Sequence, residues 1–219
     1  MIVIGISDAH GETSGIDRMG DVLRGADLVL LTGDLTHFGH SSQAARVVAT
    51  VKNYCGSVMA VPGNCDHSDV ITWLEQEDIN LHPRALAFGD IWFVGLGGSI
   101  TTPFKTPFEY SEDRARQLIS QAAEGLPDNS PFALVSHQPP AETSCDRLRD
   151  GKFAGSRAVR EFIEARQPVV CFTGHIHESV GTDQIGRTKI INPGQSDNGR
   201  YAYAEITSLE AFVELRAVK

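Results

Sequence analysis

Cysteine is scarce in this sequence, and the few cysteines form no recognisable motif. The chain of 219 residues contains four of them, with no C-x-x-C pair and no dense, regular spacing. A disulfide framework needs such spacing, so the sequence argues against one. We therefore expect reduced thiols and a cytoplasmic protein. The cysteines are Cys55, Cys65, Cys145 and Cys171.

Positive charge is also in short supply. The sequence has 19 Lys and Arg against 28 Asp and Glu, which gives a formal net charge of -9. Stable binding to nucleic acid needs clustered basic residues that neutralise phosphates, so we do not expect it here. Bound metal ions would still supply local positive charge, and a small phosphate-bearing substrate therefore remains compatible with the acidic composition.

A third absence is that of any long hydrophobic run. No apolar stretch reaches the about 20 residues needed to span a bilayer, and no basic or signal-like segment precedes the strand-like run at residues 2–6. We expect neither a membrane anchor nor a secretion signal. Hydrophobic residues make up 41% of the chain, enough for a full-sized core, and we predict a single domain over residues 1–219.

Short apolar, β-branched runs alternate with helical patterns along most of the chain. This alternation predicts a layered α/β protein with a mostly parallel sheet. Short runs near the end, separated by Gly, Asn and Ser, indicate antiparallel pairing instead. The predicted strands are residues 2–6, 28–31, 58–61, 91–96, 132–135, 169–172, 188–192, 201–206 and 211–217, and the predicted helices are residues 41–54, 70–77, 112–124 and 156–166.

Residues that can bind metal ions follow several of the predicted strands. Ligands gather at the carboxyl ends of the strands in open α/β sheets, so these side chains should converge. Alone, each has an ordinary interpretation as a turn residue, a helix cap or a buried core histidine. Their coincidence at successive strand ends favours a metal site. They are Asp8, His10, Asp34, Asn64, His137, His175 and His177.

Two of these strand ends carry paired ligands. Residues two apart in an extended segment point to the same side, so Asp8 and His10 can face one ion together, as can His175 and His177. Carboxylates combined with imidazoles suit Mn, Fe, Zn or Ni better than Ca. The pairs predict a transition-metal hydrolase.

Taken in order, these motifs resemble those of the calcineurin-like metallophosphoesterases. The likeness extends from Asp8 to about Gly194, nearly the whole chain, and Gly63-Asn64-Cys65-Asp66 looks like the small stand-alone prokaryotic phosphodiesterases of that family. The resemblance implies a layered β-sandwich of two mixed sheets flanked by helices. It also implies two divalent transition metal ions and a role for Asp66 in orienting the turn of Asn64. The implied ligands are Asp8, His10 and His177 for the first ion, Asn64, His137 and His175 for the second, and Asp34 between them.

The implied reaction is hydrolysis of a phosphoester by a metal-bound hydroxide, with Asp34, Asn64 and His137 at the reacting centre. Two divalent ions bring about +4, of which the ligand carboxylates cancel about 2 and a bridging hydroxide about 1. The remaining charge of about +1 matches a phosphodiester monoanion. A monoester dianion stays open, because hydrogen bonds in the pocket could offset the excess charge.

Cys65 departs from the family pattern. Many members have a histidine at this position, which is thought to protonate or stabilise the leaving oxygen, and a thiol is a weak donor. We take Cys65 and His67 as candidate catalytic residues, with His37 and His40 as further sources of an imidazole. Each of these histidines could equally be a surface or capping residue.

Other classes of function fit less well. The sequence has no G-x-S-x-G nucleophile elbow, and its glycine-rich stretches lack the last residues of the dinucleotide and P-loop motifs. Catalysis by Cys65 with His67 lacks a third member. The serious alternative is a scaffold with little or no catalysis, as some proteins that resemble this family are. Such a scaffold can lose ligands, whereas this chain retains all of them.

We expect the walls of the substrate pocket to come from residues 101–110 and 141–155. Residues 103–110 form either a surface loop or a lid. In the second segment, Arg147, Arg149 and Lys152 are either ordinary solvated charges or binding groups for a second phosphate or a carboxylate.

Overall fold

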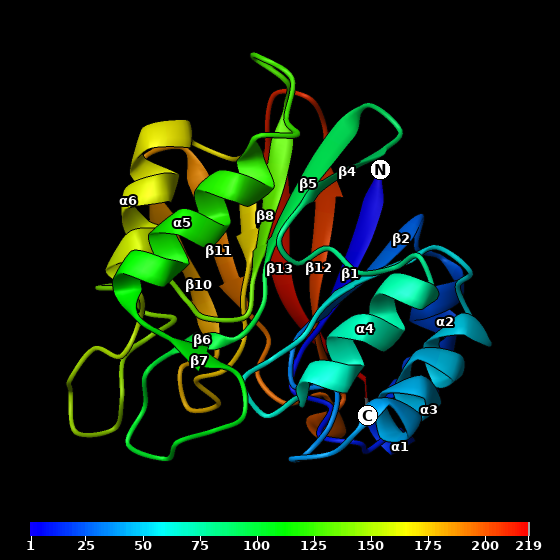
Figure 1. Cartoon of the computed structure of the whole chain (residues 1–219). Coiled ribbons are helices and arrows are strands. Elements are labelled where there is room, and N and C mark those ends of the chain that lie inside the picture. Colours follow the sequence, from blue (N-terminus) through cyan, green and yellow to red (C-terminus); the bar gives the residue numbers. More distant parts are fainter. Residues whose placement is uncertain (219) are drawn as a thin grey trace.

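Two β-sheets form the centre of the molecule, as the computed structural model shows for residues 1–218 (Figure 1). The strands of the first sheet are, in order across it, β13 (Ala211–Ala217), β12 (Arg200–Ile206), β1 (Ile2–Ile6), β2 (Leu28–Thr32) and β3 (Val58–Val61). Those of the second are β10 (Gly181–Ile185), β11 (Thr188–Asn192), β9 (Val170–Phe172), β8 (Phe132–Ser136), β5 (Ile91–Leu96) and β4 (Ala85–Phe88).

Both sheets are mixed. In the first, β1, β2 and β3 run parallel, while β12 pairs antiparallel with both β1 and β13. In the second, β5, β8, β9 and β11 run parallel, and the edge strands β4 and β10 are antiparallel to their neighbours. The predicted sandwich of two mixed sheets is confirmed. The parallel pairing predicted from the strand and helix alternation holds for β1 to β3 and for β5, β8, β9 and β11, but not for the other strands of the two sheets.

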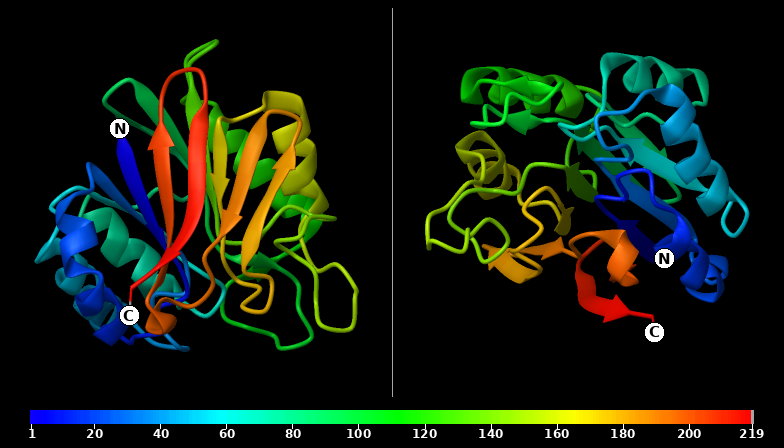
Figure 2. Two further views of the ribbon diagram at one scale, coloured as in Figure 1. Left: turned by 180° about the vertical axis from the view of Figure 1, so that it is seen from behind. Right: turned by 90° about the horizontal axis from the view of Figure 1, so that it is seen from below.

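Helices cover the outer face of each sheet, which gives four layers (Figures 1 and 2). Beside the first sheet lie α1 (Ser14–Arg18), α2 (Gly20–Arg24), α3 (Ser41–Lys52) and α4 (Ser68–Gln76). Beside the second lie α5 (Glu112–Ala123) and α6 (Arg157–Arg166). The remaining elements are the short strands β6 (Ser99–Ile100) and β7 (Glu109–Tyr110) and the 3-10 turn η1 (Ser196–Asn198).

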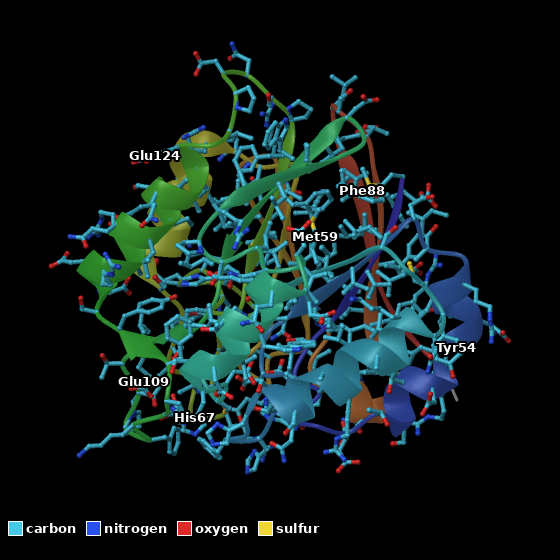
Figure 3. The ribbon with its side chains drawn as sticks, turned by 45° about the vertical axis from the view of Figure 1, so that its right-hand side comes forward. Tyr54, Met59, His67, Phe88, Glu109 and Glu124 are labelled. Carbon is cyan, nitrogen blue, oxygen red and sulfur yellow. The ribbon has the colours of Figure 1, made fainter. Side chains whose placement is uncertain are left out.

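The hydrophobic core follows these layers. Apolar residues of α3, such as Val47 and Val51, pack with residues of the first sheet. Phe93 and Phe172 belong to a cluster between the two sheets, where Met59 also lies (Figure 3). A third cluster joins α5 and α6 to the second sheet. The buried core thus holds both sheets in fixed positions, so that loops at the strand ends are anchored on a rigid support.

Hydroxyl caps determine where two of the predicted helices begin. The Ser111 side chain accepts a hydrogen bond from the Arg114 amide at the start of α5, and Ser156 does the same for Val159 at the start of α6. Each cap satisfies one backbone N–H that has no partner inside the helix. Among residues 1–218, no helix has the length and apolar character needed to cross a membrane.

Candidate metal centre

The metal-capable residues converge at one end of the sheets. Asp8 and His10 follow β1, Asp34 follows β2, and Asn64 follows β3. His137 follows β8, and both His175 and His177 follow β9. Figure 3 shows Glu109 and His67 at this end of the molecule, whereas Phe88 and Glu124 lie at the opposite end. Five of the seven predicted ligands, His10, Asp34, Asn64, His175 and His177, line one cavity of about 860 Å³.

Several of these residues have unusual backbone conformations, which set the direction of their side chains. Asp8, His10, Asp34 and His175 have positive φ angles of 54°, 49°, 49° and 67°. The left-handed region is disfavoured for residues with a Cβ atom and persists only where the surroundings enforce it. The turns after β1 and β2 hold each other in place, since the His10 amide donates to the Asp34 carbonyl at 2.8 Å.

A first group of potential ligands consists of Asp8, His10, Asp34 and His177. One ligand atom from each lies within 4.8 Å of all the others. His177 Nε2 is 3.2 Å from both Asp8 Oδ1 and His10 Nε2. Neighbouring ligands of a six-coordinate ion with bonds of about 2.1 Å lie about 3 Å apart. The donor set and its spacing therefore fit a divalent transition metal ion.

A second group forms around His137, which is completely buried. Its Nδ1 lies 2.8 Å from the Thr32 carbonyl, an acceptor, so Nδ1 carries a proton, and in the neutral tautomer Nε2 has a free lone pair. Nε2 faces Asn64 Oδ1 at 3.0 Å and Asp34 Oδ1 at 3.4 Å. Three acceptor atoms that converge without a donor between them fit a bound cation.

Asp34 connects the two groups. Its Oδ2 lies 3.9 Å from His10 Nε2, while its Oδ1 faces His137 and accepts a hydrogen bond of 2.8 Å from the Cys65 amide. The carboxylate is 2% exposed. Each oxygen thus faces a different group, so this carboxylate could be shared by two ions.

His175 lies beside the second group. Its ring is 5.2 Å from the His137 ring in an edge-to-face arrangement, and its amide donates to Asp8 Oδ2 at 3.1 Å. Burial lowers the pKa of His175 to about 3, and the neighbouring His137 adds to this effect. A neutral imidazole is the form that binds metal ions.

The two buried carboxyl groups have opposite pKa shifts. Burial raises the pKa of Asp34, and the Asp8 carboxylate adds to the rise. Burial also acts to raise the pKa of Asp8, but the hydrogen bond with His177 and the proximity of His137 outweigh it and lower the pKa overall. Two carboxylates this close repel each other, and a cation between them would relieve the repulsion.

Asp66 fastens the turn that contains Asn64 to the turn that contains Asp34. Its carboxylate accepts hydrogen bonds from the Gly63 amide at 2.8 Å and from the Leu35 and Thr36 amides at 3.1 and 2.8 Å. A Cβ atom on Gly63 would lie 2.0 Å from the Asp34 backbone nitrogen, so only glycine fits there. These contacts match the orienting role that the resemblance implied for Asp66.

The structure separates the candidates for a proton donor. Burial and the Asp34 carboxylate raise the pKa of Cys65, so its thiol stays protonated and is a poor nucleophile. The His67 ring stacks on that of His40 at 4.6 Å and is not among the residues that line the cavity. His37 does line it, with its ring 5.5 Å from that of His10.

Thr106 is a neighbour of the site that the sequence did not reveal. Its hydroxyl accepts a hydrogen bond of 3.0 Å from Asn64 Nδ2. The expectation that residues 101–110 form a wall of the pocket is correct, since Phe104 and Thr106 line the cavity. No sequence signal distinguishes Thr106 from the other polar residues of this loop.

Comparisons with known proteins identify the class. The family model described as calcineurin-like phosphoesterase matches residues 1–179, and the chain belongs to this family. An uncharacterized protein of Methanocaldococcus jannaschii is 36% identical over 197 residues, which cover 88% of each chain. The predicted membership is thereby confirmed.

Solved structures of low sequence identity share the fold. A protein of Thermus thermophilus has a TM-score of 0.74 at 18% identity, with 100% of this chain and 99% of that one covered. A dimetal phosphatase of Danio rerio has a TM-score of 0.64 at 14% identity, with 99% and 96% covered. These likenesses confirm the four-layer architecture.

Proposed function

We propose that this protein is a dinuclear metal-dependent phosphoesterase that prefers phosphodiesters. Family membership supports metal-dependent hydrolysis of phosphoesters as the general activity. The observation that carries the dinuclear proposal is the position of Asp34, whose two oxygens face two different sets of acceptor atoms.

In this proposal, each group of residues holds one divalent ion, drawn from Mn, Fe, Zn or Ni. The first ion is held by Asp8, His10 and His177, the second by Asn64, His137 and His175, and Asp34 is shared. The bound ions would supply Lewis-acid stabilisation of the phosphoryl oxygens and an activated water.

The protein itself contributes orientation and a hydrogen-bond donor. Thr32 fixes the tautomer of His137 through its carbonyl, and Asp66 fixes the turn of Asn64. Since His37 lines the cavity and His67 does not, we place His37 as the imidazole that donates a hydrogen bond to the leaving oxygen. In this proposal the contribution of Cys65 is its backbone amide, which donates a hydrogen bond to the Asp34 carboxylate and so orients it.

Charge is the argument for diesters. Two divalent ions with Asp8, Asp34 and a hydroxide leave about one positive charge, which a diester monoanion balances. In the described part of the chain, the residues that line the cavity include no Lys or Arg that would neutralise the second charge of a monoester. Both arguments favour the diester.

The experiment compares bis-p-nitrophenyl phosphate with p-nitrophenyl phosphate as substrates after loading the purified protein with Mn, Ni, Fe or Zn. We expect metal-dependent hydrolysis, with the higher kcat/KM for the diester. Asp34→Ala and His137→Ala should abolish it. Bound metal without hydrolysis of either ester would favour the alternative, a protein-interaction scaffold, and a higher kcat/KM for the monoester would overturn the diester preference.

A further inference from the structure

A second cavity, of about 640 Å³, opens beside the candidate metal centre. We call it the side pocket. It shares the lining residues His175, His177 and Phe104 with the cavity of the metal-capable residues, so the two spaces adjoin each other. A molecule with one group at the metal centre can therefore extend into the side pocket.

The wall of the side pocket is largely apolar. The carbon-rich residues that line it are Ile100, Pro103, Phe104, Leu148, Ala154 and Ile176. Phe104, which lines both cavities, is 81% exposed, an unusual exposure for a large aromatic side chain. Exposed apolar surface of this kind around a cavity is typical of a ligand-binding site.

Two polar side chains of the side pocket, those of Gln138 and Thr102, already have partners within the protein. Gln138 accepts a hydrogen bond of 3.2 Å from the Ile100 amide and donates one of 2.8 Å to the Ala154 carbonyl. The Thr102 hydroxyl donates to Glu109 at 2.6 Å. These groups shape the pocket, and a ligand gains little from bonding to them because an existing bond would be lost.

No spare positive charge faces this space. In the part of the chain that the structure describes, the lining contains no Lys or Arg. Of the nearby cations, Arg149 pairs with Glu178 at 3.1 Å and Lys152 pairs with Asp150 at 2.8 Å. Arg147 is exposed and does not line the pocket. Glu178 is itself part of the lining, so an anionic group would meet a carboxylate. The two ion pairs, and the absence of all three cations from the lining, favour ordinary solvated charges over a binding site for a second phosphate.

We propose that the side pocket binds an uncharged, apolar ester group of the substrate while the phosphate lies at the metal centre. The inference rests on the proposed function and adds a substrate class, phosphoesters of an aromatic or aliphatic alcohol. Size permits it, since an apolar cavity of about 150 Å³ already accommodates benzene. Removing on the order of 60 Å² of additional apolar surface from water strengthens binding about tenfold.

Phosphonates test this directly, because each has a single organic group and none is hydrolysed. Binding of methyl-, butyl-, phenyl- and 2-carboxyethylphosphonate to the Mn-loaded protein is measured by calorimetry. We expect the butyl or the phenyl compound to bind at least about tenfold more tightly than the methyl compound. The carboxyethyl compound should bind no more tightly than the methyl compound. The butyl and phenyl arms distinguish an aliphatic from an aromatic ester group.

A matched pair of variants locates the effect. Leu148→Asp places a carboxylate in the side pocket and should abolish the preference for the apolar group. Leu209→Asp makes the same change at a residue that is 83% exposed and lies outside the pocket lining, and it should leave the preference unchanged. Circular dichroism and thermal unfolding are used to check that both variants are folded.

The outcomes separate the two proposals. If all four phosphonates bind equally, or if the carboxyethyl compound binds most tightly, the side-pocket proposal fails while the metal centre stands. A preference that survives Leu148→Asp in the folded variant also overturns it. If no phosphonate binds to the Mn-loaded protein, the metal-centre proposal fails together with this one.

Discussion

Asn64 and Thr106 are joined by a hydrogen bond of 3.0 Å from the side-chain amide nitrogen to the hydroxyl oxygen. Thr106 in turn donates to Glu109 at 2.6 Å. Because the side-chain nitrogen of Asn64 donates to Thr106, its side-chain oxygen points at His137. A loop distant in the sequence thus sets the orientation of a proposed metal ligand.

Glu109 is well suited to hold this arrangement. Partial burial acts to raise its pKa, but hydrogen bonds from Thr102 and Thr106 outweigh burial and lower the pKa below its ordinary value. The carboxylate therefore remains an acceptor at neutral pH, and Thr106 keeps its orientation.

Replacing Thr106 by valine should weaken binding of the second metal ion. Valine has a similar shape but cannot accept the hydrogen bond from Asn64, so the amide is free to rotate. Loss of such an orienting contact typically reduces metal affinity or activity by about tenfold to a hundredfold. Metal titration monitored by calorimetry measures the change. Thr106→Ser should restore affinity, and an unchanged affinity in Thr106→Val would rule out the orienting role.

Metal content should differ between Asp34→Ala and His137→Ala. Asp34 faces both groups, so its loss should leave less than one tightly bound ion per chain, whereas loss of His137 should leave about one. Elemental analysis after equilibration with Mn and gel filtration gives the ratio. His40→Ala, at an exposed histidine that pairs with Asp69, is the matched control and should keep the wild-type content. Equal metal contents in Asp34→Ala and His137→Ala would contradict a shared ligand.

Much of this site could be predicted from the sequence because its ligands are tied to strand ends. The carboxyl ends of parallel strands meet at one edge, so residues that directly follow apolar runs, such as Asp8 and Asp34, are brought together by the fold. No comparable rule of topology predicts the contact of Thr106 with Asn64. The residues lie 42 positions apart, and their contact depends on the path of an irregular loop.

The same limit applies to the fold. Strands buried on both faces, such as β2, stand out as apolar runs, whereas the edge strand β10 (Gly181–Ile185) is polar and half-exposed and was missed. The helices α1 and α2 are five residues each, too short for a helical period to be recognised. Pairing of β12 with β1 is likewise a tertiary contact, and it joins the two ends of the chain.

Replacing His37 by glutamine should slow the hydrolysis of esters with poor leaving groups more than that of esters with good ones. In His37→Gln the imidazole that lines the cavity is lost, and we expect kcat for a methyl or alkyl leaving group to fall by about a hundredfold, with a much smaller effect for p-nitrophenolate. The leaving-group dependence of kcat measures this. His67→Gln is the comparison, since His67 stacks on His40 outside the cavity lining. If His67→Gln shows the larger effect, His67 and not His37 acts on the leaving oxygen.

A buried histidine that is not one of the proposed metal ligands should make stability depend on pH. The pKa of His82 is lowered to about 4, chiefly by burial, and its Nδ1 accepts a hydrogen bond of 3.0 Å from the Gly97 amide, which requires an unprotonated nitrogen. In the unfolded chain the pKa returns to about 6.5. Above that pH His82 is neutral in both states and does not alter stability.

Below about pH 6.5 the unfolded chain takes up a proton that the folded protein does not, so stability falls as the pH is lowered towards 4. The slope from this residue should reach about 1.4 kcal/mol per pH unit. Urea unfolding of the metal-free wild type and His82→Gln from pH 7 to 4.5 isolates the effect, because other groups titrate alike in both. Glutamine can still accept from the Gly97 amide, so the variant should lose less stability on acidification than the wild type. Parallel slopes in the two proteins would mean that His82 is protonated in the folded state as readily as in the unfolded chain.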